Sequence, residues 1–454
     1  MNLVRFALFS IAAVAVAPWA AAVPPLPTSP DVPDQLDLPT AVRYALDNNY
    51  AIRQARERLR EQEGLILEVR GSILPNVSLF SNYSRSDEEL SSDVGPIGTA
   101  PDGDQQYWSF SLEARQLLYS GGGARAAVDA QRLVREASLL ELQSIINDQL
   151  LQVRSKFYEI LLRREQIQVQ EQNVRLLEEQ LQTARNRFEA GSVSNFDVLR
   201  AEVELANAQP ALIRARNGFR IAVEELRQLI GYDNRDDQNV NRVPEFVGEL
   251  TVQPVSYDIA DALRTAREQR PELQRLDRVQ AAREAGVEIA RSGYKPDLSL
   301  VAGYQLRKHN FSERFGDSLD GWTVGVESNW PIWDGGTTRG RVMRAASQLE
   351  QARLQRAEAM LIVDVEVRRA LSSLQEATEL AAAAGRTVDQ AEEALRLANA
   401  RYAAGSATQL DVLAAQVSLT QARDNQLEAS FSYNTAVAAV RRALGQTDAL
   451  VATE

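Results

Sequence analysis

An internal duplication constrains the fold of this chain more than any other feature of its sequence. The segment 187–199 reads Arg-Phe-Glu-Ala-Gly-Ser-Val-Ser-Asn-Phe-Asp-Val-Leu, and a similar segment returns 214 residues later at 401–413. The same offset relates Trp108 to Trp322, whereas an offset of 221 relates Pro75 to Pro296. The sequence therefore predicts one structural unit built twice, over 36–231 and 257–445, with a connector at 232–256.

The first copy contains a very long segment without helix breakers. No Gly or Pro occurs in 124–190, and at ~1.5 Å per residue a helix of this length would be a rod of roughly 100 Å. Some of its apolar residues follow the 4-3-4-3 spacing of a coiled coil: Ile146, Leu150, Val153, Phe157 and Ile160. A glycine then ends the helical run, so we expect helical hairpins with tips near 191 and, in the second copy, near 405.

Two shorter segments before each long helix alternate apolar and polar residues, which predicts β-strands with one apolar face. We expect strands at about 76–86 and 107–117 in the first copy, and at about 297–308 and 322–330 in the second. Strands of about ten residues can cross a bilayer, but four strands cannot close a barrel and open edges do not occur in lipid. If the strands are membrane-embedded, several chains must share one barrel.

Tryptophan placement bears on the choice between a membrane barrel and a soluble sheet with an aromatic core. Beyond residue 22, all tryptophans lie in or beside the predicted strands: Trp108, Trp322, Trp330 and Trp333. Aromatic girdles of this kind mark the two interfaces of a membrane barrel. We therefore expect these four side chains to be membrane-interface aromatics.

Composition narrows the compartment and the function. Residues 1–22 have a positive start, an apolar stretch and an Ala-Ala-Ala end, which predicts a signal peptide, followed by a proline-rich lead-in at 23–35. The chain has no cysteine, which excludes disulfides, thiolate metal sites and a lipidated N-terminal cysteine. A net charge of −12 without a basic run argues against a nucleic-acid partner. Residues 446–454 form a C-terminal tail.

Taken together, these features resemble the TolC-like outer-membrane efflux proteins. The resemblance rests on the signal peptide, the two-fold repeat, the duplicated hairpin turn, and the segment 331–336, Pro-Ile-Trp-Asp-Gly-Gly, before a long helix. It implies an α+β membrane protein: a homotrimer with a 12-stranded β-barrel in outer-membrane lipid and an α-helical tunnel in the periplasm. It also implies two partners, a periplasmic adaptor (membrane fusion) protein and an inner-membrane transporter of the RND, ABC or MFS type, with no cofactor.

The resemblance implies that both hairpin tips dock the adaptor. The positions concerned are Gly191, Ser192, Val193, Gly405, Ser406 and Ala407. Each glycine also has a simpler role as the left-handed residue that ends a helix, and the two roles are compatible.

The periplasmic entrance is expected near the same tips. By resemblance, Asp411 forms an acidic ring there, with Asp197 as its counterpart in the first copy and Tyr402 as a retained aromatic. Asp197 and Asp411 also have the spacing of helix capping boxes, which is the alternative explanation. A second acidic ring and a closing arginine would fall at Ala414 and Ala407, which cannot supply them, so the closed-state bonds are left open.

Two strand carboxylates, Glu113 and Glu327, are expected to face the barrel lumen, with a solvated strand charge as the alternative. The sequence does not name the cargo, since efflux of drugs, detergents or metal ions and type I protein secretion both fit a passive duct. A periplasmic coiled-coil adaptor or scaffold is a rival of another class. It explains the hairpins but not the paired amphipathic strands. No nucleophile, metal cluster or cofactor loop favours an enzyme.

Overall fold

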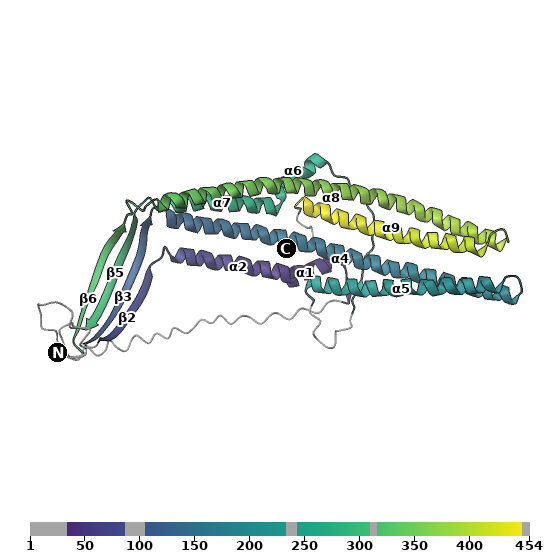
Figure 1. Cartoon of the computed structure of the whole chain (residues 1–454), viewed down its shortest axis with the longest axis horizontal. Helices are drawn as coiled ribbons and strands as arrows, with labels where there is room; N and C mark the ends of the chain where they lie inside the picture. The colour runs from purple at the N-terminus through teal and green to yellow at the C-terminus, as the bar shows by residue number, and fades with distance from the viewer. Residues whose placement is uncertain (1–33, 87–104, 233–242, 309–315, 447–454) are drawn as a thin grey trace.

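The computed structural model describes residues 34–86, 105–232, 243–308 and 316–446. The predicted signal peptide lies outside these ranges, as do nearly all of the proline-rich lead-in and of the C-terminal tail. The described residues form an elongated molecule with a β-sheet at one end and long helices that extend away from it (Figure 1). The fold is α+β, as the sequence predicts, with four long strands and two helical hairpins in one chain.

The four long strands form one antiparallel sheet in the order β2–β3–β5–β6. Its strands are β2 (Asn76–Ser86), β3 (Gln105–Ser120), β5 (Asp297–Lys308) and β6 (Ser318–Asn329). The two hairpins share one register, because Ser81 pairs with Phe110 in the first copy and Ala302 pairs with Val324 in the second. These pairs differ by the offsets 221 and 214, so the duplication extends to the hydrogen-bonding pattern.

Two strands differ in length from the expectation. β3 extends beyond 107–117 at both ends, and β6 begins at Ser318 rather than near 322. In both cases the pairing continues past the point where alternation is visible, for example from Trp322 on to Asp320, which pairs with Leu306. Backbone pairing with a neighbouring strand therefore sets the ends, and side-chain pattern alone does not show it.

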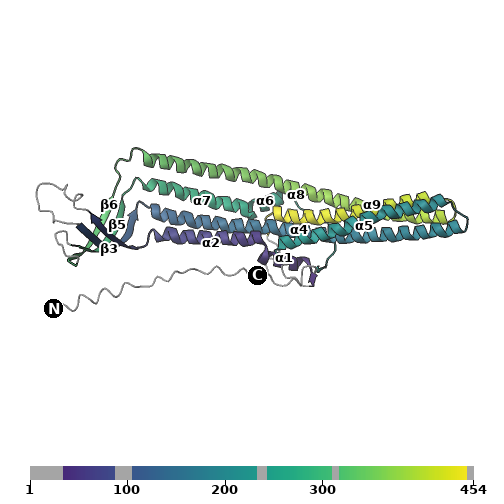
Figure 2. The same ribbon diagram turned by 60° about the horizontal axis from the view of Figure 1, so that its bottom comes forward.

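Two helices of 67 residues, α4 (Gly123–Glu189) and α8 (Thr337–Ala403), run the length of the helical part. Each turns back into a shorter helix, α5 (Asn195–Ile230) or α9 (Gln409–Ala443), and the two tips lie together at the end farthest from the sheet (Figure 2). The remaining length of each rod is covered by α2 (Tyr50–Gly71) or α7 (Pro271–Ser292). α4 packs against α2, α5, α7 and α9, whereas α8 packs mainly against α7 and α9.

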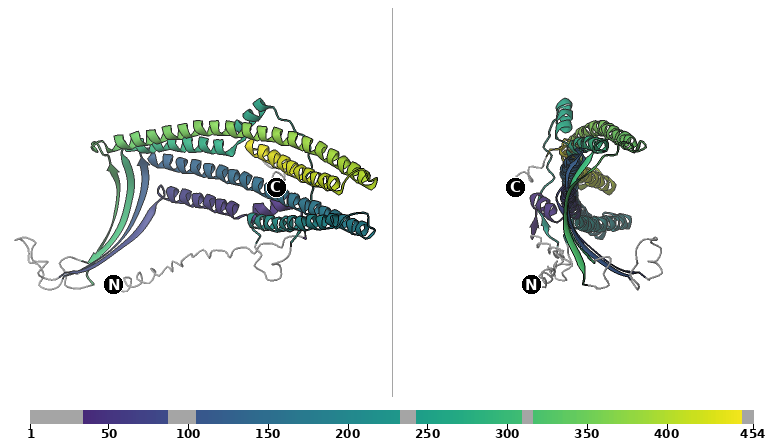
Figure 3. Two further views of the ribbon diagram at one scale, coloured as in Figure 1. Left: turned by 45° about the vertical axis from the view of Figure 1, so that its right-hand side comes forward. Right: turned by 90° about the vertical axis from the view of Figure 1, so that its left-hand side faces the viewer.

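The largest apolar clusters lie at the middle of the rods. There α1 (Leu38–Asn48) and the two-stranded parallel pair β1 (Gln35–Leu36) and β4 (Glu245–Phe246) cover α4 and α5. In the second copy α6 (Ile259–Gln269) and the start of α7 cover α8 and α9 (Figure 3). These two apolar clusters pack the short elements against the long helices midway between the sheet and the tips.

None of the helices in the described part of the chain is both long and apolar enough to cross a membrane.

Candidate functional site

The first hairpin tip is closed by Gly191, which has a left-handed φ of +72° after α4 ends at Glu189. The Gly191 N–H donates to the carbonyl of Phe188, and the Ser192 N–H donates to that of Arg187, both at 2.9 Å. These bonds satisfy carbonyls that the end of the helix would otherwise leave without partners. A Cβ at position 191 would meet no atom within 4 Å, so the backbone conformation, not space, requires glycine.

The second tip repeats this arrangement. Gly405 has φ of +71°, its N–H donates to the Tyr402 carbonyl at 3.1 Å, and the Ser406 N–H donates to the Arg401 carbonyl at 2.9 Å. Of the six residues predicted to dock a partner, four are exposed, while Val193 and Ala407 are half-buried. The structure thus presents both predicted tips at one end of the molecule.

Both predicted aspartates cap the returning helices. Asp197 Oδ2 accepts from the Ser194 N–H at 3.0 Å and from its hydroxyl at 2.8 Å. Asp411 Oδ2 accepts from the Thr408 N–H and hydroxyl, each at 2.8 Å. The backbone and side-chain bonds from Thr408, with the nearby charge of Arg401, hold the pKa of Asp411 below its usual value. Asp411 is exposed, and its lowered pKa keeps it ionised at neutral pH.

Tyr402 joins the two tips within one chain. The guanidinium carbon of Arg187, near the end of α4, lies 4.4 Å from the centre of the Tyr402 ring, near the end of α8. This cation–π contact couples hairpins that are more than 200 residues apart in sequence. Sequence reasoning missed the role of Arg187, although Arg187 and Arg401 open the duplicated turn segment and so provided a signal.

One face of the sheet is apolar and exposed. Its exposed members come from all four strands: Val77, Leu79, Phe110, Leu112, Tyr304, Trp322, Val324 and Val326. Val326 is 65% exposed and Trp322 is 75% exposed, and both lie beside other exposed apolar residues on the same face. A continuous apolar face of this kind marks contact with lipid or with another protein.

The tryptophans lie at two levels of this sheet. Trp108 pairs with Tyr83 and Trp322 pairs with Tyr304, which places four aromatic residues at the end remote from the helices. Trp330 and Trp333 follow β6 at the helical end and are exposed. Eight residues from Trp322 to Trp330 span roughly 26 Å of strand, or less if tilted, comparable with the ~25 Å apolar band of membrane barrels.

The opposite face of the sheet carries charge. Arg115 Nη1 lies 2.9 Å from Glu327 Oε2, and Arg115 Nε lies 3.5 Å from Glu113 Oε1. The two predicted lumen carboxylates therefore share one arginine, which bridges them across β5. Sequence reasoning missed Arg115, although it follows Glu113 by two residues and so belongs to the same face.

In the ranges that the structure describes, no group of three or more His, Cys, Asp or Glu side chains could hold a metal ion. The features described above are surfaces: two exposed tips, one apolar sheet face and one charged sheet face.

Comparison with known proteins identifies the class of this architecture. The sequence model of the family described as "Outer membrane efflux protein" matches residues 41–232 and 262–446, one match to each copy of the repeat. The cobalt-zinc-cadmium resistance protein CzcC of Cupriavidus metallidurans is 25% identical over 419 residues, covering 90% of each chain. The alkaline protease secretion protein AprF of Pseudomonas aeruginosa is 24% identical over 387 residues, covering 84% of this chain and 78% of that protein.

The fold has experimental counterparts. The solved structure of the outer-membrane channel OprN superimposes with a TM-score of 0.75 at 21% sequence identity and covers 90% of both chains. The likeness therefore extends to the sheet and the helical rods alike.

Proposed function

Because the chain belongs to the outer membrane efflux protein family, we propose that it forms the passive duct of a tripartite export system. The protein resides in the outer membrane and extends into the periplasm. The proposed cargo is small molecules such as drugs, detergents or metal ions. The duct itself carries out no chemical step and takes its energy from its partners.

The observation that carries this proposal is the union of an exposed apolar sheet with helical rods in one chain. The apolar face suits lipid, and the sheet is about as tall as a membrane barrel requires. The rods, each of 67 residues or roughly 100 Å, can extend from it across an aqueous compartment. A periplasmic scaffold needs the rods but has no use for an exposed apolar sheet.

The sheet also supports a trimer. β2 and β6 are its outermost strands, each paired on one side among the described residues. Lipid does not tolerate an open sheet edge, so the edges of neighbouring chains should pair until the barrel closes. Three copies give twelve strands. The apolar face then meets lipid, and Glu113, Arg115 and Glu327 face the lumen.

The tips are the proposed docking points for the partners. A trimer would present six of them, formed by Gly191, Gly405 and their neighbours, to a periplasmic adaptor protein. The adaptor in turn would connect the duct to an inner-membrane transporter. Their exposure and their repeated backbone geometry support this role. Three copies of Asp411 would also line the entrance as a single acidic ring.

The cargo is the part of the proposal with a real competitor. CzcC is named for cobalt, zinc and cadmium resistance, whereas AprF is named for secretion of a protease. Relatives of nearly equal identity thus support either small-molecule efflux or type I protein secretion. We favour efflux, and the experiment below separates the two.

The test is a deletion of the gene in a strain that lacks other export ducts, with complementation by the full chain. A matched control is complementation by the chain without residues 1–22, which should fail if export to the outer membrane is needed. Selective hypersensitivity to dyes, detergents, antibiotics or metal salts, reversed by the full chain alone, supports efflux. Unchanged susceptibility with loss of a secreted protein supports secretion. If the deletion alters neither susceptibility nor secretion, the duct proposal is refuted.

A further inference from the structure

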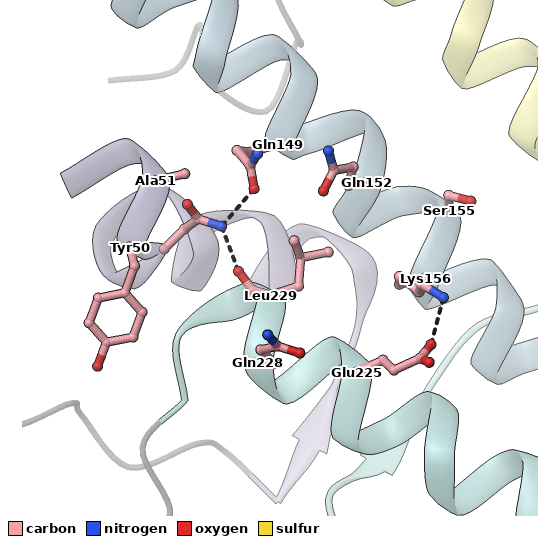
Figure 4. Close-up of a pocket in the computed structure, with 10 residues that line it drawn as sticks. Tyr50, Ala51, Gln149, Gln152, Ser155, Lys156, Glu225, Gln228 and Leu229 are labelled. Atoms are coloured by element: carbon pink, nitrogen blue, oxygen red, sulfur yellow. Dashed lines mark hydrogen bonds and ion pairs between the residues drawn. The ribbon is translucent and has the colours of Figure 1, made fainter. Parts of the chain in front are cut away.

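An open pocket of about 700 Å³ lies at the middle of the rods, where the start of α2, the end of α5 and the centre of α4 meet (Figure 4). Its wall is mostly uncharged: Asn49, Tyr50, Ala51, Gln149, Gln152, Ser155, Gln228 and Leu229, with Lys156 and Glu225 at one side. The Asn49 amide donates to Gln149 Oε1 at 2.9 Å and to the Leu229 carbonyl at 2.6 Å. Lys156 and Glu225 pair with each other at 2.6 Å.

The duplication shows what occupies the equivalent position in the second copy. The repeat offsets convert Ala51 to Glu272 and Gln228 to Arg442. There the long helix of the other copy, α4, covers the position. Asp148 Oδ1 of α4 lies 2.7 Å from Arg442 Nε, and the Ser144 hydroxyl donates to Glu272 Oε1 at 3.1 Å. In the second repeat, side chains of α4 therefore occupy the position that is open in the first repeat.

The same offset identifies the helix that could fill the pocket of the first copy. The counterpart of α4 is α8, and the counterparts of Asn147 and Asp148 are Leu361 and Ile362. Asn147 and Asp148 are half-buried, whereas Leu361 is 68% and Ile362 is 52% exposed. Within the described residues of one chain, no helix lies over the pocket as α4 lies over its counterpart, and Leu361 and Ile362 of α8 stay exposed.

We propose that this pocket is a socket for Ile362 of α8 from a second copy of the chain. The inference rests on the proposed trimer and names a contact within it. Since the in-chain interface places a long helix over a helix start and a returning-helix end, repetition around a ring places the next long helix over the open pocket.

The chemistry of the two interfaces supports this pairing. In the chain, Asp148 meets Arg442. Between two chains, Ile362 of one would meet Gln228 of the other, so the acid and the base are both replaced by uncharged residues. A charge left on one side alone would be buried without a partner, which is strongly unfavourable. Both charges of the in-chain Asp148–Arg442 pair are therefore absent at the equivalent positions.

The same rule fixes the pairing of strands between copies. In the chain, Leu112 of β3 pairs with Tyr304 of β5. The offsets convert this pair to Val326 of β6 and Tyr83 of β2 in the neighbouring copy. The strand edges and the socket therefore follow from one symmetry operation, and a contact at one predicts a contact at the other.

The absence of native cysteine makes a thiol test clean. The variant Ile362→Cys/Gln228→Cys, treated in the intact membrane with a short thiol-specific cross-linker, should give covalent dimers and trimers on denaturing gels. The in-chain control Asp148→Cys/Arg442→Cys should remain monomeric. The displaced control Leu354→Cys/Gln228→Cys moves one thiol eight residues, or about 12 Å, along the helix and should cross-link several-fold less.

Equal cross-linking by the 354 and 362 variants would overturn the socket. Light scattering of the uncross-linked protein in mild detergent separates this result from failure of the duct. A trimer without the predicted cross-link refutes only the socket, whereas a monomer refutes the shared barrel as well. Because paired substitutions can disturb folding, a photoreactive amino acid at position 362 alone provides a second measurement. Adducts on residues 49–51 or 225–229 of another copy support the socket, and adducts elsewhere overturn it.

Discussion

At the hairpin tips the two copies of the repeat are built alike, whereas at the middle of the rods they differ in charge. The tips share a left-handed glycine, the same pair of carbonyl bonds and the same capping box. At the middle, Asn49 joins α2 to α4 and α5 through neutral amide bonds. Its counterpart Arg270 instead forms ion pairs with Glu366 at 2.5 Å and Glu272 at 3.2 Å.

This difference separates features set by backbone conformation from features set by the side chains of a neighbouring helix. A helix that must turn back within a few residues has few solutions, so both tips keep the same ones. The middle of a rod tolerates any side chains that match the helix lying against them. Arg442, for example, pairs with Glu366 at 3.0 Å and with Asp148 of the first repeat of the same chain at 2.7 Å. The charged cluster therefore reflects its in-chain cover.

The largest effect should come from breaking that cluster. Arg270→Met should destabilise the second copy by about 3 kcal/mol, because the Arg270 side chain is only 3% exposed and its carboxylate partners would lose it. Burial alone would raise the pKa of Glu272, but the charge of Arg270 and hydrogen bonds outweigh it and hold the pKa down. The measurement is hydrogen exchange of residues 262–273 and the thermal midpoint in detergent.

The matched variant in the first copy is Asn49→Ala. It removes the neutral bonds to Gln149 and Leu229 and the cap on Ile52, and should cost about 1 kcal/mol. Equal losses for the two variants would mean that the charged cluster adds nothing beyond a helix cap.

The tips and strands could be predicted from sequence, but the contacts between the two copies could not. Gly191 and Gly405, the capping aspartates and the alternating strands are local patterns that a single segment displays. The cluster around Arg270 draws on Asp148, Glu366 and Arg442, which lie far apart along the chain. Arg187 and Tyr402 are likewise brought together only by the packing of α4 against α9, whose hairpin partner α8 carries Tyr402. Nothing local marks such partners.

A medium effect should distinguish the two capping aspartates. Asp411→Asn should lower the cation-over-anion permeability ratio in planar bilayers a few-fold, because it removes three charges from the proposed entrance ring. Asp197→Asn, at the half-buried counterpart, should change the ratio less. Equal ratios for wild type and Asp411→Asn, in a correctly assembled trimer, would leave Asp411 with its capping role only.

Acidification should sharpen the same contrast. Since the pKa of Asp411 is lowered, its charge and the cation preference should persist as pH falls to about 4. Its stabilising effect on the cap is present above the unfolded-state pKa of ~3.9 and is lost as pH falls through the lower folded-state value. Ion selectivity recorded from pH 7 to 3 checks this order, and an early loss near pH 5 would contradict it.

The smallest effect should come from the cation–π contact that joins the two tips. Arg187 stacks on Tyr402, and at a partly exposed site this is worth about 0.5 kcal/mol. Arg187→Gln should speed hydrogen exchange of the Ser192 amide about twofold, since that amide bonds to the Arg187 carbonyl at the same tip. Tyr402→Phe keeps the ring and should change nothing. Tyr402→Leu combined with Arg187→Gln should cost no more than either alone, because both remove one interaction. Additive losses would show that the two hairpins are held by separate contacts, and that Arg187 does not couple them.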